Sequence, residues 1–371
     1  MNHLSVQRAA DPTSLPGWDQ LGANASFYAC ARWLAYADVA SGASSEYLVT
    51  RANDLTIAAL SIHRLDGGFG AEYNPAIAIP DACLSSNAVL IGGYRGYRSS
   101  VLKASRADVS AAVTRTIDEG VRDAEWWWPH LTFHDASFLQ RAFAAEGRDT
   151  SLNFIGVDHS VRSRASFESH VTHLPSKQRR TNARREHSIA RELGIRVKRL
   201  RLAECWDSLV PLLAGVEAKY GNNPELARLR RLVRLQAEHL DDIAMVFGCE
   251  DTEGRLIGFS LCYRGANELA LRIVGFDYDH LRGGEYSLVA IYEPLVYAAE
   301  HGIRNVHLGI DSDEAKVRRG SVLEPLWAVS SHGESAHAAS VARARSIAAG
   351  LPEREAAALL GAVESALGYR Q

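Results

Sequence analysis

Two short segments in the last third of the chain have residue types and spacings that could do chemistry. The first is a glycine turn, Gly283-Gly284-Glu285, which leads into a stretch with apolar residues at helical spacing. The second is a run of acidic and basic residues at 311–320. Backbone N–H groups at the start of a helix attract anions and developing negative charge. The two segments therefore predict a site that binds an anionic group or stabilises an oxyanion.

A strand-helix-strand unit is expected to position both segments. Residues 269–275 and 306–310 are apolar enough for buried strands, and residues 286–301 have the period of a helix that stops at Gly302. A unit of about 40 residues is long enough to cross over between two parallel strands. Because open α/β sheets bind ligands at the carboxyl ends of their strands, we expect both segments at one edge of a sheet.

The composition favours a two-lobed globular protein. The chain has 371 residues, of which 47% are hydrophobic and 23% charged, enough for two cores of ordinary size. No apolar run reaches the roughly 18 residues of a membrane span, and the first residues do not form a basic region followed by an apolar core. We therefore expect a soluble, cytoplasmic protein. The cysteines are scattered, and His130 and His134 lie in a strand-like stretch, so no metal site is expected.

The most pronounced charge cluster lies between Lys177 and Arg201. It holds ten Lys or Arg residues and two acidic residues, in a chain whose net charge is -3. Ser176 and Gly194 are suited to start and stop a helix there. Five basic residues then fall along one stripe of that helix: Lys177, Arg180, Arg184, His187 and Arg191. Such a stripe is typical either of a surface that binds a nucleic-acid backbone or of a solvated face without a partner.

The two halves of the chain show a similar order of elements. A strand meander at 46–63 precedes the glycine and tyrosine segment 92–98 and a helix at 105–120, as a meander at 243–275 precedes the glycine turn. We predict lobes at 1–165 and 166–334. Helices at 335–371 are expected to pack on the second lobe.

Three consecutive tryptophans, Trp126-Trp127-Trp128, lie in a predicted strand of the first lobe. Side chains alternate between the two faces of a strand. We therefore expect at least one of them in the core and one toward a groove or the other lobe. Sheet packing is the favoured interpretation, and stacking on a nucleic-acid base is the alternative.

Three segments of the second half resemble a known family. They are the basic segment Leu174–Arg185, the helical run Tyr292–Ile303 and the segment Glu314–Trp327. Together they resemble the two-lobed group of the GNAT superfamily that contains the Fem-type aminoacyltransferases and their relatives in peptidoglycan and natural-product biosynthesis. The resemblance implies an α/β (α+β) fold with tandem GNAT-like lobes. Each lobe would be a mixed, centrally antiparallel sheet flanked by helices.

The resemblance implies transfer of an acyl or aminoacyl group from an activated carrier to an amine. GNAT acetyltransferases hold the CoA pyrophosphate at this glycine turn, but here Glu285 stands in the turn and would repel a pyrophosphate at close range. The basic helix instead fits an RNA backbone. We therefore predict an aminoacyl-tRNA donor and the amine of a small acceptor, in natural-product or cell-wall-like biosynthesis. The alternatives are an acyl-CoA-dependent N-acyltransferase and a non-catalytic RNA- or peptide-binding protein.

The predicted site residues follow from these roles. Amide formation from an activated ester needs alignment, one base and oxyanion stabilisation, and no cofactor besides the donor co-substrate. No membrane partner is expected. Further candidates for the base are Asp313, His307 and His280. The predicted residues are catalytic Glu285, Asp277, Asp311 and Tyr286; donor-binding Lys316, Arg319, Gly283 and Gly284; nucleic-acid-binding Lys177, Arg180, Arg184, Arg191 and Lys198; and acceptor-binding Tyr94, Arg95, Tyr97 and Arg98.

Overall fold

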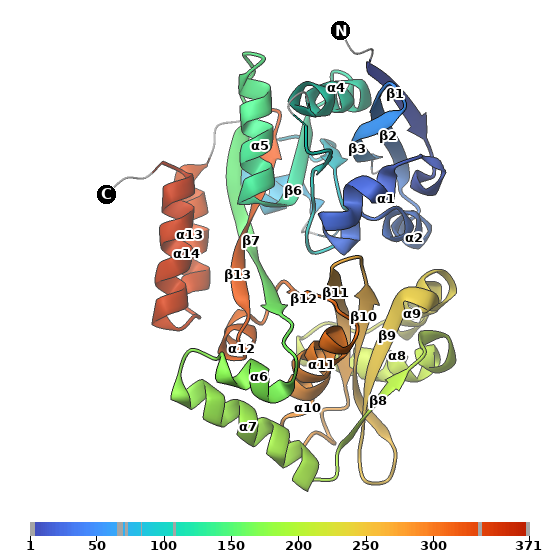
Figure 1. The fold of residues 1–371 in the computed structure, drawn as a ribbon, viewed down its shortest axis with the longest axis vertical. Coiled ribbons are helices and arrows are strands. Elements are labelled where there is room, and N and C mark those ends of the chain that lie inside the picture. Colours follow the sequence, from blue (N-terminus) through green and yellow to red (C-terminus); the bar gives the residue numbers. More distant parts are fainter. Residues whose placement is uncertain are drawn as a thin grey trace. The chain divides into compact units, whose positions relative to one another are not determined.

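The chain divides into two structural units. A computed structural model describes residues 4–64, 70, 73–82, 84–106, 109–332 and 336–368. The first unit comprises residues 1–158 and 323–371, and the second comprises residues 159–322. The division near residue 158 falls inside one strand, β7 (Ser151–Arg162), whose two halves therefore belong to different units. The first unit is thus built from both ends of the chain (Figure 1).

The first unit contains a mixed sheet. Its strands are β1 (Leu4–Ala9), β2 (Ser44–Ala52), β3 (Leu55–Arg64), β4 (Val89–Ile91), β6 (Trp126–Thr132) and β13 (Val322–Ser330), in that spatial order, followed by β7. The short strand β5 (Leu102–Lys103) also pairs with β3. Strands β1 to β4 are antiparallel, β4 and β6 are parallel, and β6 and β13 are antiparallel. Between β4 and β6 the chain passes through β5 and α4 (Val109–Val121), a connection long enough to join two parallel strands.

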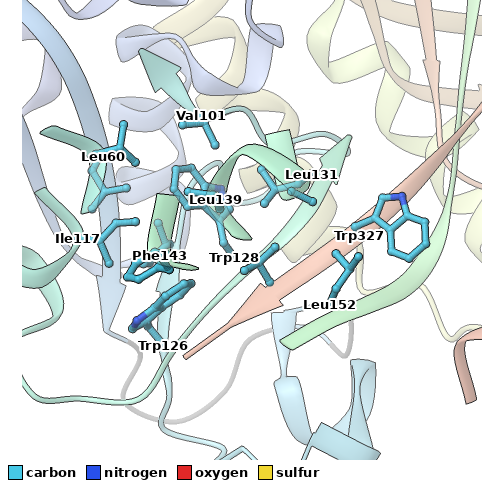
Figure 2. Packing of buried hydrophobic residues seen from close by; sticks show 14 of the residues in the cluster. Leu60, Val101, Ile117, Trp126, Trp128, Leu131, Leu139, Phe143, Leu152 and Trp327 are labelled. Carbon is cyan, nitrogen blue, oxygen red and sulfur yellow. The ribbon is translucent and has the colours of Figure 1, made fainter. Parts of the chain in front are cut away.

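Helices cover this sheet and complete its core. They are α1 (Trp18–Leu21), α2 (Ala31–Ser41), α3 (Pro75–Ala78), α4 (Val109–Val121), α5 (Phe133–Ala144), α13 (His337–Ala348) and α14 (Glu353–Ala366). Figure 2 shows the larger cluster, in which Trp126 and Trp128 pack with residues of α4 and α5 such as Ile117 and Phe143. Trp127 points to the other face and joins a second cluster. All three tryptophans are at most 2% exposed, so the favoured interpretation, sheet packing, is confirmed, and none of them faces an open groove.

The C-terminal helices α13 and α14 pack on the first unit, not on the second as the sequence suggested. Val341, Leu359 and Val363 lie in the same cluster as Trp126, and the backbone N–H of Phe154 donates to Ser340 Oγ at 3.0 Å. The apolar period of a helix predicts that one face is buried, but it does not tell which core covers that face. The sequence predicts that the first lobe ends at residue 165. In the structure, the amino-terminal segment of the first unit ends at residue 158.

The second unit contains a sheet that is also mixed. Its sheet runs β8 (Arg196–Leu200), β9 (Ala244–Glu250), β10 (Leu256–Arg264), β11 (Glu268–Phe276), β12 (Asn305–Gly309) and the carboxyl half of β7. Only β11 and β12 are parallel among the described pairs of this sheet. The helices are α6 (Phe167–Thr172), α7 (Lys177–Glu192), α8 (Leu202–Lys219), α9 (Leu226–Leu240), α10 (Glu285–Ser287), α11 (Glu293–Glu300) and α12 (Asp313–Arg318).

The crossover predicted between residues 269 and 310 is present, with a widened turn inside its helix. Between α10 and α11, residues Leu288–Tyr292 form a π-helical turn. Pro294 follows within the first turn of α11. Proline has no N–H for the carbonyl of Ala290, four residues before it, and its ring would clash with that carbonyl. A π turn relieves this clash by widening the backbone spiral.

Strands β11 and β12 separate toward their carboxyl ends. Their parallel pairing covers three residue pairs and ends at Ala270 and His307, whereas β11 stays paired with β10 as far as Phe276. The glycine turn follows β11 and the 311–320 segment follows β12. Both predicted segments therefore lie where two parallel strands diverge, which is the usual ligand position in such sheets. No helix in the described part of the chain is long and apolar enough to cross a membrane.

Candidate functional site

The glycine turn before α10 binds a carboxylate of its own chain. Gly283 and Gly284 have φ values of 123° and 91°, which a residue with a side chain rarely adopts. The Glu285 side chain folds back, and its carboxylate accepts hydrogen bonds from the backbone N–H groups of Arg282 at 2.6 Å and Gly283 at 2.8 Å. Glu285 is only 1% exposed. Two of the N–H groups of this turn are therefore already bonded to an internal carboxylate.

The turn is also held against helix α7. A β-carbon at Gly284 would lie 2.8 Å from the carbonyl oxygen of Glu186, so only glycine fits there. The Glu186 side chain meets the Arg319 guanidinium at two points, with Nη2 to Oε1 at 2.7 Å and Nε to Oε2 at 3.1 Å. Arg319 Nε also donates to Ser287 Oγ at 2.6 Å, and the Tyr292 hydroxyl donates to Glu186 Oε2 at 2.8 Å. We call Glu186, Ser287, Tyr292 and Arg319 the ionic hub.

The ionic hub joins α7, α10, the π-helical turn and the end of α12. Burial, followed by the nearby Glu186 carboxylate, raises the pKa of Tyr292, so its hydroxyl stays protonated and keeps donating. Arg319 is predicted to bind the donor. In the structure, its guanidinium forms hydrogen bonds to residues of the second unit. It also donates to the carbonyl oxygen of Ala315 at 2.8 Å.

Lys316, the second predicted donor-binding cation, is buried at 4% exposure. Its Nζ donates to the carbonyl oxygens of Gly309 at 3.1 Å and Ile310 at 2.6 Å. These contacts hold the end of β12. The next two residues, Asp311 and Ser312, are exposed and have φ values of 65° and 53°. Positive φ values at two successive non-glycine residues are strained. They persist only where the surrounding structure holds them, which is common at functional sites.

Two further catalytic candidates lie on the loop between β11 and the glycine turn. Asp277 Oδ2 lies 2.7 Å from His280 Nδ1, and both side chains are partly exposed. His280 and Arg282 line a small hollow of about 110 Å³ together with Arg255. Tyr286 packs on Phe276, and burial raises its pKa to about 12. Tyr286 is therefore protonated at neutral pH and could act as a hydrogen-bond donor but not as a base.

A further set of side chains meets beyond the end of β12. His159 Nε2 lies 2.9 Å from Asp313 Oδ1, and His159 Nδ1 lies 2.9 Å from Ser321 Oγ. Asp313 is one of the candidate bases that the sequence predicts, whereas no pattern in the sequence indicates His159 or Ser321. They are 154 and 162 residues from their partners, so no local spacing could have indicated the contact.

The acceptor-binding candidates lie in the loop after β4 in the first unit. Tyr94 is 6% exposed and packs against Tyr73 and His63, and Tyr97 packs edge-on against Tyr28. Arg95 is partly buried and has a φ of 57°. Arg98 Nε donates to the buried carboxylate of Asp158 at 2.6 Å. The segment is thus built into the first unit rather than displayed as a free loop.

A buried histidine lies near the Arg98–Asp158 pair. His130 is 8% exposed, has a φ of 59°, and its Nδ1 has no hydrogen-bond partner among the described residues. Burial lowers its pKa to about 4, and the charge of Asp158 opposes this shift. Burial also raises the pKa of Glu324, which the charge of Arg98 opposes. The first unit therefore holds its own cluster of ionisable groups at the carboxyl ends of β4 and β6.

Three of the five residues of the predicted basic stripe lie on the exposed face of α7, whereas Arg180 and His187 are partly buried. Lys177, Arg184 and Arg191 are exposed, while Ala183 and Ala190 on the opposite side are buried. Arg184 pairs with Glu168 at 3.1 Å, Arg180 Nη1 donates to the Leu174 carbonyl oxygen at 2.7 Å, and Lys198 on β8 pairs with Glu250 at 2.8 Å. No ion pair or side-chain hydrogen bond of Lys177 or Arg191 is found within the described ranges. Among the residues predicted to bind nucleic acid, these two cations are therefore the most available for a partner.

Comparisons with known proteins place the chain in a family. The FemAB-like family, described as peptidoglycan biosynthesis/recognition, matches residues 88–350. The structure of FemX is similar with a TM-score of 0.58 and 9% identity, over 87% of this chain and 96% of FemX. A conserved protein of unknown function from Bacteroides thetaiotaomicron VPI-5482 is similar with a TM-score of 0.54 and 11% identity, over 81% of this chain and 89% of that chain.

A tandem GNAT protein from the clavulanic acid biosynthesis pathway aligns with a TM-score of 0.46 and 12% identity, over 90% of this chain and 100% of that chain. No curated protein matches the chain by sequence. The likeness to solved structures concerns the fold, whereas the family match extends over more than half of the chain. The chain therefore belongs to the FemAB-like family of peptidoglycan biosynthesis and recognition.

Proposed function

We propose that this protein transfers an aminoacyl group from aminoacyl-tRNA to the amine of a small acceptor. The family description makes an amine of a cell-wall peptide the first acceptor to test, and a natural-product amine the second. The acyl carbon of the donor ester is already activated, so the enzyme must align the amine, take up its proton and stabilise the oxyanion. This chemistry draws on side chains and backbone groups alone.

The observation that carries the choice of donor is the position of the Glu285 carboxylate. It accepts from Arg282 N and Gly283 N and is almost completely buried. A pyrophosphate bound at this turn would have to displace the carboxylate or lie beside a negative charge of the same unit. The turn is therefore poorly suited to CoA. An aminoacyl-tRNA needs no pyrophosphate site.

The outer face of α7 supports the same donor. Lys177 and Arg191 are exposed, and together with Arg184 they follow one stripe of the helix. Cations so placed bind phosphates without reading sequence and release counterions, which makes binding sensitive to salt. The ionic hub holds the inner face of the same helix against the glycine turn, so a phosphate backbone on α7 would be fixed with respect to the ends of β11 and β12.

The test is a comparison of donor binding at several salt concentrations. We expect aminoacylated tRNA to bind the wild type with an affinity that falls with salt, and acetyl-CoA not to bind. The double variant Lys177→Ala/Arg191→Ala should bind tRNA more weakly. It should also reduce the slope of log K against log salt by about 0.7 to 0.9 for each phosphate that is no longer neutralised.

The matched control is Arg230→Ala, which removes an exposed arginine of α9 that pairs with Asp207. It should bind tRNA like the wild type. Saturable binding of acetyl-CoA together with indifference to tRNA would contradict the proposal and favour the acyl-CoA-dependent alternative. Binding of tRNA without transfer to any amine would favour the non-catalytic alternative.

A further inference from the structure

Asp313, His159 and Ser321 form a continuous series of hydrogen bonds within the second unit. The two contacts of the His159 ring are both 2.9 Å long. The register of β7 against β12 sets this arrangement, because His159 lies opposite Gly309, the last residue of β12. Asp313 starts α12 four residues later. Ser321 follows Gly320, which has a φ of 96°, and directly precedes β13, the strand next to β7.

The partners of the ring determine where its proton lies. A carboxylate can only accept, so His159 Nε2 carries the hydrogen and donates to Asp313 Oδ1. In the neutral ring, Nδ1 then accepts from the Ser321 hydroxyl. The series thus runs from a hydroxyl through an imidazole to a carboxylate. His159 is 0% exposed, and both of its nitrogens are occupied, so the ring cannot turn.

The two ends of the series differ in what they can do. Ser321 is 8% exposed, and its backbone N–H donates to the Lys316 carbonyl oxygen at 3.2 Å, so that N–H is not available to an oxyanion. This argues against Ser321 as a nucleophile. The Asp313 side chain is 26% exposed. Within the described residues, only one of its two oxygens has a bond, the one to His159.

The surroundings of Asp313 are those of a ligand site rather than of a surface turn. The strands β11 and β12 have already separated at this level, since their pairing ends at His307. Asp311 and Ser312, directly before Asp313, are held in strained conformations, and Lys316 clamps the carbonyls of Gly309 and Ile310. The backbone that carries Asp313 is therefore fixed on both sides.

We propose that Asp313 is the general base of the transfer reaction and that His159 and Ser321 are positioning residues. This inference rests on the proposed function. As the acceptor nitrogen bonds to the acyl carbon, its acidity rises and its proton passes to the free oxygen of Asp313. The ester bond to the ribose oxygen then breaks, and Asp313 returns the proton to that oxygen. His159 keeps the carboxylate oriented throughout, and Ser321 keeps the ring in the required tautomer.

The test uses bulk aminoacylated tRNA as donor and a peptide with a free lysine amine as acceptor. We expect Asp313→Ala to lower kcat by at least about 100-fold, the size of a lost general base, with the affinity for tRNA unchanged. Formate should restore part of the rate of Asp313→Ala in proportion to its concentration, because a small carboxylate can replace the missing one. The matched control is Glu314→Ala, the neighbouring exposed carboxylate, which pairs with Arg318 and should keep kcat within about twofold.

The positioning role of His159 is tested by replacing its imidazole ring. His159→Gln retains an amide N–H near the place of Nε2 and should keep more activity than His159→Phe, at equal affinity for tRNA. Transfer by Asp313→Ala at the wild-type rate, or a loss that formate does not reverse, would overturn the assignment of the base and leave the proposed function standing. A wild type that binds tRNA but transfers to no amine would contradict the proposed function, and the base with it.

Discussion

Arg319 and Glu186 form a two-point ion pair although 133 residues separate them in the chain. Glu186 comes from the inner face of α7, and Arg319 from the end of α12. The side chains are 20% and 26% exposed, so water screens them only in part. The pair joins the helix that carries the basic stripe to the turn that contains Glu285.

The first prediction concerns this pair. Glu186→Gln should lower the free energy of unfolding of the second unit by about 2 kcal/mol, because it leaves the half-buried Arg319 without its counter-charge. Chemical denaturation combined with hydrogen exchange of the α7 amides measures this. Glu314→Gln breaks an exposed pair with Arg318 and should change stability by less than about 0.5 kcal/mol. Equal effects of the two changes would contradict the importance of the ionic hub.

The second prediction concerns the filled glycine turn. Glu285→Ala removes the acceptor of two backbone N–H groups and should cost about 2 kcal/mol of stability. The freed groups should then bind an anion, so inorganic pyrophosphate should raise the Tm of the variant and leave that of the wild type unchanged. Thermal melts with and without pyrophosphate measure both effects. Equal stabilisation of both proteins would show that the turn is open in the wild type.

The third prediction concerns acid sensitivity. Burial lowers the pKa of His63 and of His130 from 6.5 to about 4, against the opposing effects of the Gly92 carbonyl on His63 and of Asp158 on His130. The unfolded chain therefore takes up protons first. The stability that these neutral rings contribute is complete above pH 6.5 and is lost as the pH falls toward about 4.

At about pH 5, each of these two histidines should lower the free energy of unfolding of the first unit by about 2 kcal/mol relative to neutral pH. Urea denaturation at about pH 7.5 and pH 5 measures the loss in the wild type and in His63→Gln, whose loss should be smaller. Replacement of the exposed His332 by Gln serves as the comparison and should leave the pH dependence as in the wild type. An unchanged loss in His63→Gln would rule out its part in the effect.

The fourth prediction concerns the C-terminal helices. Leu359 on α14 is 2% exposed in the core of the first unit, so Leu359→Ala should lower the stability of that unit by about 3 kcal/mol. Tryptophan fluorescence can follow this unit, because every tryptophan except Trp206 lies in it. Arg354→Ala on the exposed face of the same helix should have an effect below about 0.5 kcal/mol. A normal unfolding curve for Leu359→Ala would argue against this packing.

Features that depend on neighbouring residues could be predicted from the sequence. The crossover between residues 269 and 310, its glycine turn and the helix at α7 follow from local periodicity, glycine and capping residues. The sequence also indicated that Glu285 would disfavour an anion. It did not show that the carboxylate turns inward to fill the turn, because this requires the positive φ values of two successive glycines.

Features that depend on distant partners could not be predicted. Lys316 and Arg319 were expected to bind a ligand, yet their charges are directed at carbonyls and at Glu186 of the same unit. His159 and Ser321 carry no local signal, since the register of β7 against β12 alone brings the histidine to Asp313. A residue's chemical type was readable from the sequence, but its partner was not.

The return of the chain to the first unit has a consequence for synthesis on the ribosome. Residues 159–322 are continuous, so the second unit can fold as soon as they have emerged. The first unit still lacks β13 and the helices that cover Trp126 at that time, because these elements follow the second unit in the chain. Translation therefore finishes the amino-terminal unit last. A nascent chain that stops early would leave that core open to chaperones and proteases.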